Sequence, residues 1–152
     1  MSIIPIKSSG IAAVLLKEIN DMYHVLLLKR TSHHLHNIWC YIGGGMEEGE
    51  TVIEAVYREI AEETGITELA LYSSNQFDQI FSPQENYIYI ASVFVGFVHP
   101  EQSVVLNDEH SDYQWLPFEQ AKELVSLPGN AEVLQSIEHN FVKKKPLKYL
   151  RI

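Results

Sequence analysis

The sequence has 152 residues, of which 46% are hydrophobic and 20% charged, a composition typical of a globular protein with one sizeable core. Its formal net charge of −9 argues against a nucleic-acid partner, because phosphate backbones are bound by clustered Lys and Arg. No apolar run approaches the roughly 18 residues of a membrane span, residues 1–9 make a poor signal peptide, and the single cysteine, Cys40, cannot form an internal disulfide. We therefore expect a cytoplasmic protein with no membrane partner and a single domain over residues 1–152.

The first part of the chain predicts strands. Apolar runs at 10–16 and 25–28 predict two strands, and Asn20-Asp21 between them is a turn signal. The first run is continuous, which indicates burial on both faces of a sheet. A short strand is predicted over 39–42, and it leads into the three glycines at 43–45.

A helix follows the glycines. Thr51 and Glu54 have the spacing of a capping box, with Thr51 as the N-cap. Gly65 suits the left-handed position that ends a helix. The helix carries an apolar stripe at helical spacing, formed by Val52, Ile53, Val56 and Ile60.

The second half predicts further strands at 69–72, 87–98 and 112–116, and then a helix over 117–127 that begins near Pro117. We expect Asn130 to cap a last helix, whose buried residues are Val133, Leu134, Ile137 and Phe141. Short strands mixed with few helices predict an α/β fold, with a mixed sheet covered by helices on both faces.

The strongest chemical signal lies in the predicted helix after the glycines. Glu59, Glu62 and Glu63 stand at i, i+3 and i+4, so they share one helical face. Three such carboxylates repel one another unless a cation neutralises them, and oxygen ligands of this kind suit Mg²⁺ or Mn²⁺. Arg58 can reach Glu54 or Glu62 and hold a carboxylate in place. The alternative for three glutamates alone is a solvated acidic face.

The spacing of this segment matches a longer pattern. Residues 44–66 read GGMEEGETVIEAVYREIAEETGI, which resembles the Nudix box, G-x5-E-x7-R-E-U-x-E-E-x-G-U, where U is aliphatic. Every defined position is matched, and the positions that demand one residue type are Gly44, Glu50, Arg58, Glu59, Glu62, Glu63 and Gly65. The resemblance implies the Nudix α/β/α sandwich and a Mg²⁺-dependent hydrolase, with Mn²⁺ as a possible substitute.

The resemblance also implies a role for each box position. The three helix glutamates would be metal ligands, together with the backbone carbonyl of Gly43 or Gly44. Glu50 would be an outer ligand or a structural anchor, Gly65 a structural position, and Arg58 would orient the helix carboxylates. Either Glu59 or Glu63 is a candidate for the base that deprotonates the attacking water.

A second motif lies outside the box. Residues 109–116 resemble the E-H-x-x-Y-x-W-L stretch of two Nudix subfamilies, the dATP and dihydroneopterin triphosphate pyrophosphohydrolases and the dinucleoside tetraphosphate hydrolases. By this resemblance Glu109 would lie near the metals as a further ligand and as the other candidate base. The alternative is an ordinary acidic residue in a loop.

Other candidates have weaker support. Arg30 ends the second strand, where it would meet a substrate phosphate, although a surface role fits as well. His33, His34 and His36 lack a metal-ligand spacing, which favours a solvated loop. Aromatic residues could stack on a base or belong to the core, namely Trp39, Phe77, Phe81, Tyr87 and Tyr89. The last ten residues are basic, which favours a solvated tail over a binding surface; the basic residues are Lys143, Lys144, Lys145, Lys148 and Arg151.

The two motifs together predict hydrolysis of a nucleoside triphosphate, with a purine nucleotide such as dATP favoured. The alternatives are a dinucleoside polyphosphate (Ap4A-type) hydrolase and then an ADP-ribose or sugar-nucleotide hydrolase. A non-catalytic ligand sensor on the same fold is a further alternative that the intact box disfavours. The expected partner is a nucleotide, and the expected assembly is a monomer or a homodimer.

Overall fold

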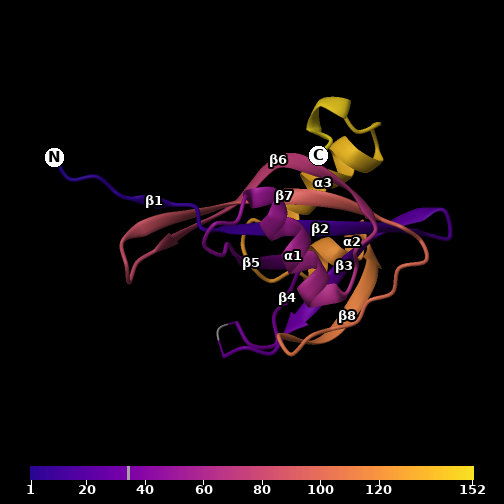
Figure 1. Ribbon diagram of the computed structural model, residues 1–152, viewed down its shortest axis with the longest axis horizontal. Helices are drawn as coiled ribbons and strands as arrows, with labels where there is room; N and C mark the ends of the chain where they lie inside the picture. The colour runs from indigo at the N-terminus through magenta and orange to yellow at the C-terminus, as the bar shows by residue number, and fades with distance from the viewer. Residues whose placement is uncertain (34) are drawn as a thin grey trace.

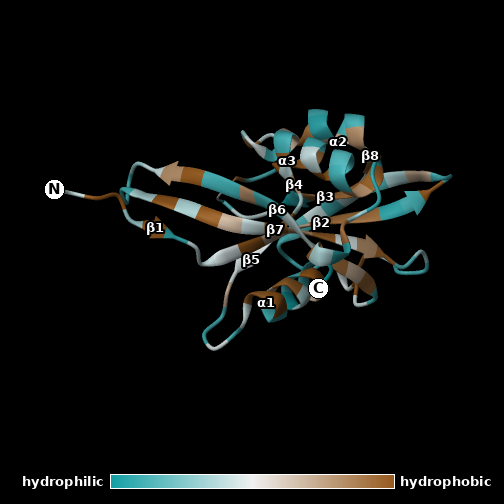
Figure 2. Ribbon diagram, turned by 90° about the horizontal axis from the view of Figure 1, so that it is seen from above, coloured by the Kyte–Doolittle hydropathy of each residue, from teal (hydrophilic) through white to brown (hydrophobic). Residues whose placement is uncertain are grey.

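The computed structural model describes residues 1–33 and 35–152, and it has a mixed eight-stranded sheet with helices on both faces (Figure 1, Figure 2). The strands are β1 (Ile6–Lys7), β2 (Gly10–Ile19), β3 (Met22–Arg30), β4 (Trp39–Cys40), β5 (Ile42–Gly45), β6 (Leu69–Ser82), β7 (Tyr87–Val98) and β8 (His110–Pro117). The helices are α1 (Val52–Thr64), α2 (Phe118–Leu124) and α3 (Asn130–Ile137), and α3 continues into a π-helical turn at Glu138–Val142. A 3-10 turn at Lys148–Leu150 precedes the C-terminus.

Strand β2 lies in the middle of the fold and is buried on both faces, as its apolar run predicts. It pairs in parallel with β7 and antiparallel with β3 and β5. Successive side chains of a strand point to opposite faces. Val14 and Leu16 therefore pack with α2 and α3, whereas Ala13 and Leu15 pack with α1. This arrangement confirms the predicted α/β/α sandwich.

The strand predicted over 39–42 is two strands in the structure. β4 pairs with β3, whereas β5 pairs with β2 and places Gly45 opposite Gly10. The chain changes partner at Tyr41, which lies between the two strands and is buried. The glycines at 43–45 are thus an extension of the sheet that runs directly beneath α1.

Helix α1 begins and ends where the sequence predicts. The Thr51 hydroxyl accepts a hydrogen bond from the Glu54 N–H at 3.2 Å, and the Glu54 carboxylate accepts one from the Thr51 N–H at 2.8 Å. Gly65 ends the helix in the left-handed conformation, with φ of 72°. Of the two carboxylates predicted to be within reach of Arg58, Glu62 contacts it at 3.1 Å, whereas Glu54 serves the cap. One expectation was wrong: Val52 is 40% exposed rather than part of a buried stripe.

Several other boundaries differ from the prediction. β1 was missed because it is only two residues long, and β6 extends to Ser82 rather than 72. The extra length of β6 is polar in sequence because its pairing with β7 leaves much of it exposed. α2 ends at Leu124 rather than 127. Asn130 does not cap α3, because Gly129 precedes the helix and the Asn130 side chain points into the interior.

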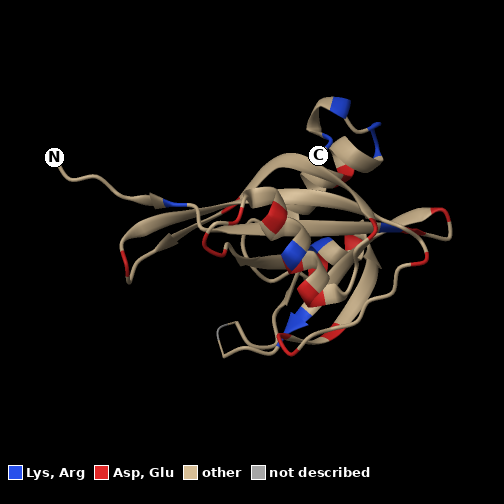
Figure 3. Cartoon of the chain, viewed as in Figure 1, with Lys and Arg blue, Asp and Glu red and all other residues tan. Residues whose placement is uncertain are grey.

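The C-terminal segment only partly matches a solvated tail. Its lysines are exposed, and Figure 3 shows basic residues gathered there while acidic residues follow α1. The last two residues are exposed but contact β6: the Ile152 N–H donates to the Leu71 carbonyl at 3.0 Å, and the Arg151 guanidinium lies 5.4 Å from the centre of the Tyr72 ring. Within the described part of the chain, no helix has the length and apolar character needed to cross a bilayer.

The capping box gives a first prediction. Thr51→Ala removes one side-chain acceptor from the start of α1, so we expect the free energy of unfolding to fall by about 1 kcal/mol. Thr51→Ser keeps the hydroxyl and is the matched control, for which little change is expected. Urea unfolding followed by circular dichroism measures both. Equal stability of the alanine and serine variants would contradict the role of the cap.

Candidate active site

A cavity of about 500 Å³ opens between α1, β5 and the start of β8. Six of the residues predicted from the sequence line it, namely Arg30, Gly43, Gly44, Glu59, Glu63 and Glu109. They come from β3, β5, α1 and the segment before β8, so the fold joins four separate parts of the chain at one place. Of the described residues, Glu50, Arg58, Glu62 and Gly65 do not belong to this lining.

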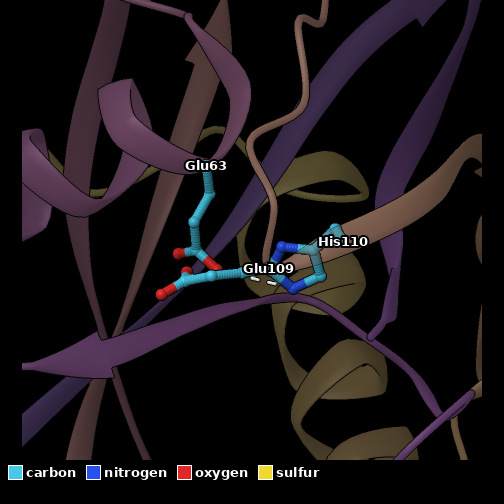
Figure 4. Close-up of side chains that lie close together, drawn as sticks. All are labelled: Glu63, Glu109 and His110. Carbon is cyan, nitrogen blue, oxygen red and sulfur yellow. Dashed lines mark ion pairs between the residues drawn. The ribbon is translucent and has the colours of Figure 1, made fainter. Parts of the chain in front are cut away.

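Glu63 is the most deeply buried acid of the cavity, with 1% of its surface exposed. Its Oε1 lies 3.5 Å from Nε2 of His110, and its Oε2 has no hydrogen-bond partner among the described residues (Figure 4). Burial raises the pKa of Glu63 to about 9, and the charges of Glu59 and Glu109 add to the shift. A buried carboxylate with a free oxygen is a group that a cation would stabilise.

Among the described residues, Glu63, Glu109 and His110 form a cluster that could hold a metal ion. One ligand atom from each lies within 4.8 Å of the others, and Figure 4 shows the two carboxylates and the imidazole side by side. Burial and the nearby charge of Arg30 lower the pKa of His110, so the ring is neutral and can offer a lone pair. The donor set and the unpartnered Glu63 oxygen both fit a divalent cation.

The sequence reasoning gave His110 no role. Its side chain is buried and its Nδ1 also has no hydrogen-bond partner among the described residues. The available signal was its place beside Glu109 in the second motif. Only the fold shows that this loop meets the last turn of α1.

Glu59 lies one turn earlier on α1 and rests against β5. A Cβ atom on Gly44 would overlap the Glu59 carboxyl group, so only glycine leaves room for it. Burial raises the pKa of Glu59 and outweighs the opposing effect of its hydrogen bond with Arg58. The glycine before the helix thus allows a carboxylate to approach the strand backbone.

Arg58 holds the structure beside the cavity together rather than lining it. Its guanidinium donates to Glu50 at 2.5 and 2.9 Å, to Glu59 at 2.9 Å, to Glu62 at 3.1 Å and to the Gly45 carbonyl at 2.9 Å. The hydrogen bonds from Arg58 to Glu50 lower the pKa of the Glu50 carboxyl group to about 2. Glu50 therefore has the geometry of the anchor that was one of its two predicted roles.

Glu62 and Gly65 lie outside the cavity. The Glu62 side chain is 52% exposed, and Arg58 is its partner. Its role as a metal ligand stays a prediction. Gly65 acts in the helix cap. Of the acids predicted from the sequence, those that face the cavity are thus Glu59 and Glu63 from the helix and Glu109 from the loop.

Arg30 brings positive charge to the acidic end of the cavity, which is the part lined by Glu59, Glu63 and Glu109. One of its terminal nitrogens donates to the Ser32 hydroxyl at 3.2 Å, and its Nε is buried without a hydrogen-bond partner among the described residues. The loop histidines lie apart from the cluster: His33 and His36 are exposed, and His36 contacts the Thr31 carbonyl at 2.9 Å. His34, the third member of that predicted group, lies outside the described residues.

The cavity also contains a polar group that the sequence reasoning missed. The Tyr41 hydroxyl donates to Asp78 at 2.5 Å and accepts from the Asn130 amide at 2.9 Å. A second hollow of about 770 Å³ adjoins the first, and Asp78, Tyr89 and Asn130 line both. Of the other aromatic candidates, Phe77 and Tyr87 line the second hollow, Phe81 is half-exposed, and Trp39 packs against the core beneath α2 and α3.

Comparison with known proteins gives consistent results. The NUDIX domain model matches residues 9–137. Nucleoside triphosphatase NudI of Salmonella paratyphi B is 31% identical over 85 residues, which is 51% of this chain and 60% of the relative. The Salmonella agona protein of the same name is 28% identical over 105 residues, covering 64% and 74% of the two chains. The match thus spans only about 60% of the Salmonella paratyphi B relative.

Two solved structures have the same fold. The E. coli dihydroneopterin triphosphate pyrophosphohydrolase superposes with a TM-score of 0.69 at 27% identity, covering 92% of this chain and 97% of that one. A C. elegans Ap4A hydrolase in a binary complex has a TM-score of 0.76 at 18% identity, with 89% and 98% covered. Because the Ap4A hydrolase is only 18% identical, its similarity to this chain shows a shared fold and nothing more.

The burial of Glu63 predicts a pH effect on stability. Its pKa is raised from 4.5 to about 9 in the folded state, so between these values the folded protein holds a proton that the unfolded chain releases. Without divalent cations, this group therefore lowers stability progressively as the pH rises through that window. Glu63→Gln removes the titration, and we expect it to be more stable than the wild type at pH 8 by at least about 1 kcal/mol.

Urea unfolding in the presence of a chelator, at pH 4, 6 and 8, measures this difference. Glu101→Gln, an exposed position in the loop after β7, is the matched control and should change little with pH. A stability gain for Glu63→Gln that is the same at all three pH values would contradict the assignment.

Proposed function

The chain belongs to the Nudix family, and on that basis we propose that it is an enzyme that hydrolyses a nucleoside triphosphate to the monophosphate and diphosphate. One observation carries the proposal: Glu59, Glu63, Glu109 and His110 face the same cavity, and two of these acids are almost fully buried. Buried acids without enough partners are unfavourable for stability, and their presence in a cavity is typical of a catalytic site.

We propose that Mg²⁺, or Mn²⁺ in its place, is the cofactor. Glu63 and Glu109 would hold it, with Glu59 and the Gly43 carbonyl beside them. The His110 imidazole suits Mg²⁺ less well than these oxygen ligands, and it lies 3.5 Å from the Glu63 carboxylate. When bound, the ion would neutralise the carboxylates, stabilise charge that develops on the diphosphate and lower the pKa of a coordinated water.

The residues of the chain have separate tasks in this proposal. Glu59, Glu63 or Glu109 would take the proton from the attacking water. Burial raises the pKa of Glu63, and a bound cation would oppose that effect and leave the carboxylate able to accept a proton. Arg30 binds a substrate phosphate at the rim. Arg58 is a positioning residue, because it acts through Glu59 and the loop that it anchors rather than on the substrate.

The substrate is assigned by similarity and stays a proposal. The NudI relatives are named nucleoside triphosphatases, which favours a triphosphate over an Ap4A-type dinucleotide or an ADP-ribose-type substrate. A purine nucleotide such as dATP is the expectation from the sequence. A cytoplasmic location, the absence of nucleic-acid and membrane partners, and a monomeric or dimeric assembly of a single domain are kept as expectations.

The rival function is a ligand sensor without catalysis. A sensor needs a cavity that binds a nucleotide. It does not need a buried carboxylate with an unpartnered oxygen, such as Glu63, next to Glu109 and His110. The intact box and this cluster both favour the enzyme.

A panel of substrates tests the reaction. With Mg²⁺ present, we expect nucleoside triphosphates to yield monophosphate and diphosphate, identified by mass. Dinucleoside tetraphosphates and ADP-ribose serve as the competing classes. Cleavage confined to dinucleoside tetraphosphates would replace the triphosphate proposal, and no cleavage of any diphosphate-containing nucleotide would support the sensor.

A single substitution tests the site. Glu63→Gln keeps the size of the side chain but removes its charge and its basicity, so we expect kcat to fall by about 100-fold or more. Glu101→Gln, the exposed control, should retain the wild-type rate. Undiminished activity of Glu63→Gln would show that the reaction does not use this cluster.

A further inference from the structure

Three polar side chains meet where the two hollows join. Tyr41 and Asn130 are 4% and 5% exposed, and Asp78 is half-buried beside them. Asp78 and Asn130 line both hollows, whereas Glu59 and Glu63 line only the first. The polar group therefore lies at the junction with the second hollow, in the same cavity as the acids but on different elements: the segment between β4 and β5, strand β6 and helix α3.

The hydrogen bonds within this group determine which atoms remain available. Tyr41 has one proton to donate, and it goes to Asp78 Oδ1 at 2.5 Å. Asn130 Nδ2 donates to the Tyr41 oxygen at 2.9 Å and lies 3.5 Å from Asp78 Oδ1. The amide nitrogen of Asn130 is thus committed to this network.

Two acceptors are left over. Among the hydrogen bonds of the described residues, none involves Asp78 Oδ2 or Asn130 Oδ1. Neither atom is among the fully buried atoms without a partner, so both can be reached from the hollows and can accept hydrogen bonds from a ligand that supplies donors. A pair of acceptors fits an edge with two neighbouring N–H donors and disfavours an edge that presents an acceptor.

We propose that Asp78 and Asn130, oriented by Tyr41, form the base-selecting end of the cavity and prefer a guanine-type edge, in which a ring N–H lies next to an exocyclic amino group. Adenine offers one amino group beside a ring nitrogen that is itself an acceptor, so it would place acceptor against acceptor. This inference rests on the proposed nucleotide hydrolysis and departs from the expectation of dATP.

The surroundings fit a planar ring. Tyr89 and Leu127 line both hollows and offer apolar surface beside the polar group. Gly10 leaves space for the Tyr89 hydroxyl, which a Cβ atom at that position would overlap. With the base at this junction, the phosphates would extend toward Arg30 and Glu63, which line the first cavity and not the second.

The experiment compares dGTP, dITP and dATP as substrates and, separately, dGMP and dAMP as ligands by calorimetry. Hypoxanthine, which is the base of dITP, keeps the ring N–H but lacks the exocyclic amino group. We expect kcat/KM in the order dGTP, dITP, dATP, with about 10- to 100-fold between the first and the last. A pterin ring has the same pair of donors, so dihydroneopterin triphosphate is included, and a preference for it over dGTP would also support this edge.

Asp78→Asn is the decisive variant, because it keeps the shape and the acceptor for Tyr41 but can present an N–H to the cavity. We expect the ratio of dGTP to dATP kcat/KM to fall by about 10-fold or more. Asp21→Asn, an exposed turn residue between β2 and β3, is the matched control and should keep the wild-type ratio. Urea unfolding confirms that the variants are folded.

The possible results are distinct. A wild type that prefers dATP, or that does not distinguish the bases in either assay, overturns the proposal. A variant that loses activity equally on both substrates shows that the network only ties α3 to the sheet, which also overturns it. If no triphosphate is hydrolysed, the proposed function fails, and the affinities for dGMP and dAMP still decide the choice of base.

Discussion

The site depends on burying two carboxyl groups, which repel each other when charged, on one helix. Glu59 and Glu63 are one turn apart on α1 and almost fully enclosed, and burial raises the pKa of both. Arg58 counters part of this repulsion through Glu59 and at the same time ties Glu62, the Glu50 loop and the Gly45 carbonyl to the helix. Glu63 has no arginine partner, and its Oε2 has no hydrogen-bond partner among the described residues, so a cation would stabilise it.

The central strand explains why the site can be enclosed. β2 packs one face against α1 and the other against α2 and α3, so the sheet has a core on each side. β5 pairs with the start of β2 and runs beneath α1, where Gly44 gives space to Glu59. Strand β3 places Arg30 at its end, and β8 pairs with β3 and begins at His110. Pairing across the sheet therefore assembles the acidic end.

The two ends of the cavity have opposite hydrogen-bonding character. The acidic end offers carboxylates and a neutral imidazole, which suit a cation, while Arg30 offers charge to an anion. The junction end offers acceptors on Asp78 and Asn130 that suit neutral N–H donors. A nucleotide bound with its phosphates at one end and its base at the other satisfies both, which links the proposed reaction to the proposed choice of base.

Local patterns in the sequence determined the helix, its caps, the box and the buried strand, because these depend on residues close together in the chain, as with Thr51, Glu54 and Gly65. Only the tertiary structure decided which glutamates face the cavity: Glu62 shares a helical face with Glu59 and Glu63, yet its side chain is 52% exposed and lies outside the lining. Tyr41, Asp78 and Asn130 are far apart in sequence and belong to no motif. His110 belongs to the second motif, but nothing in that motif shows that it meets Glu63. Their roles come from strand pairing and helix packing, which bring distant residues together and which local spacing does not encode.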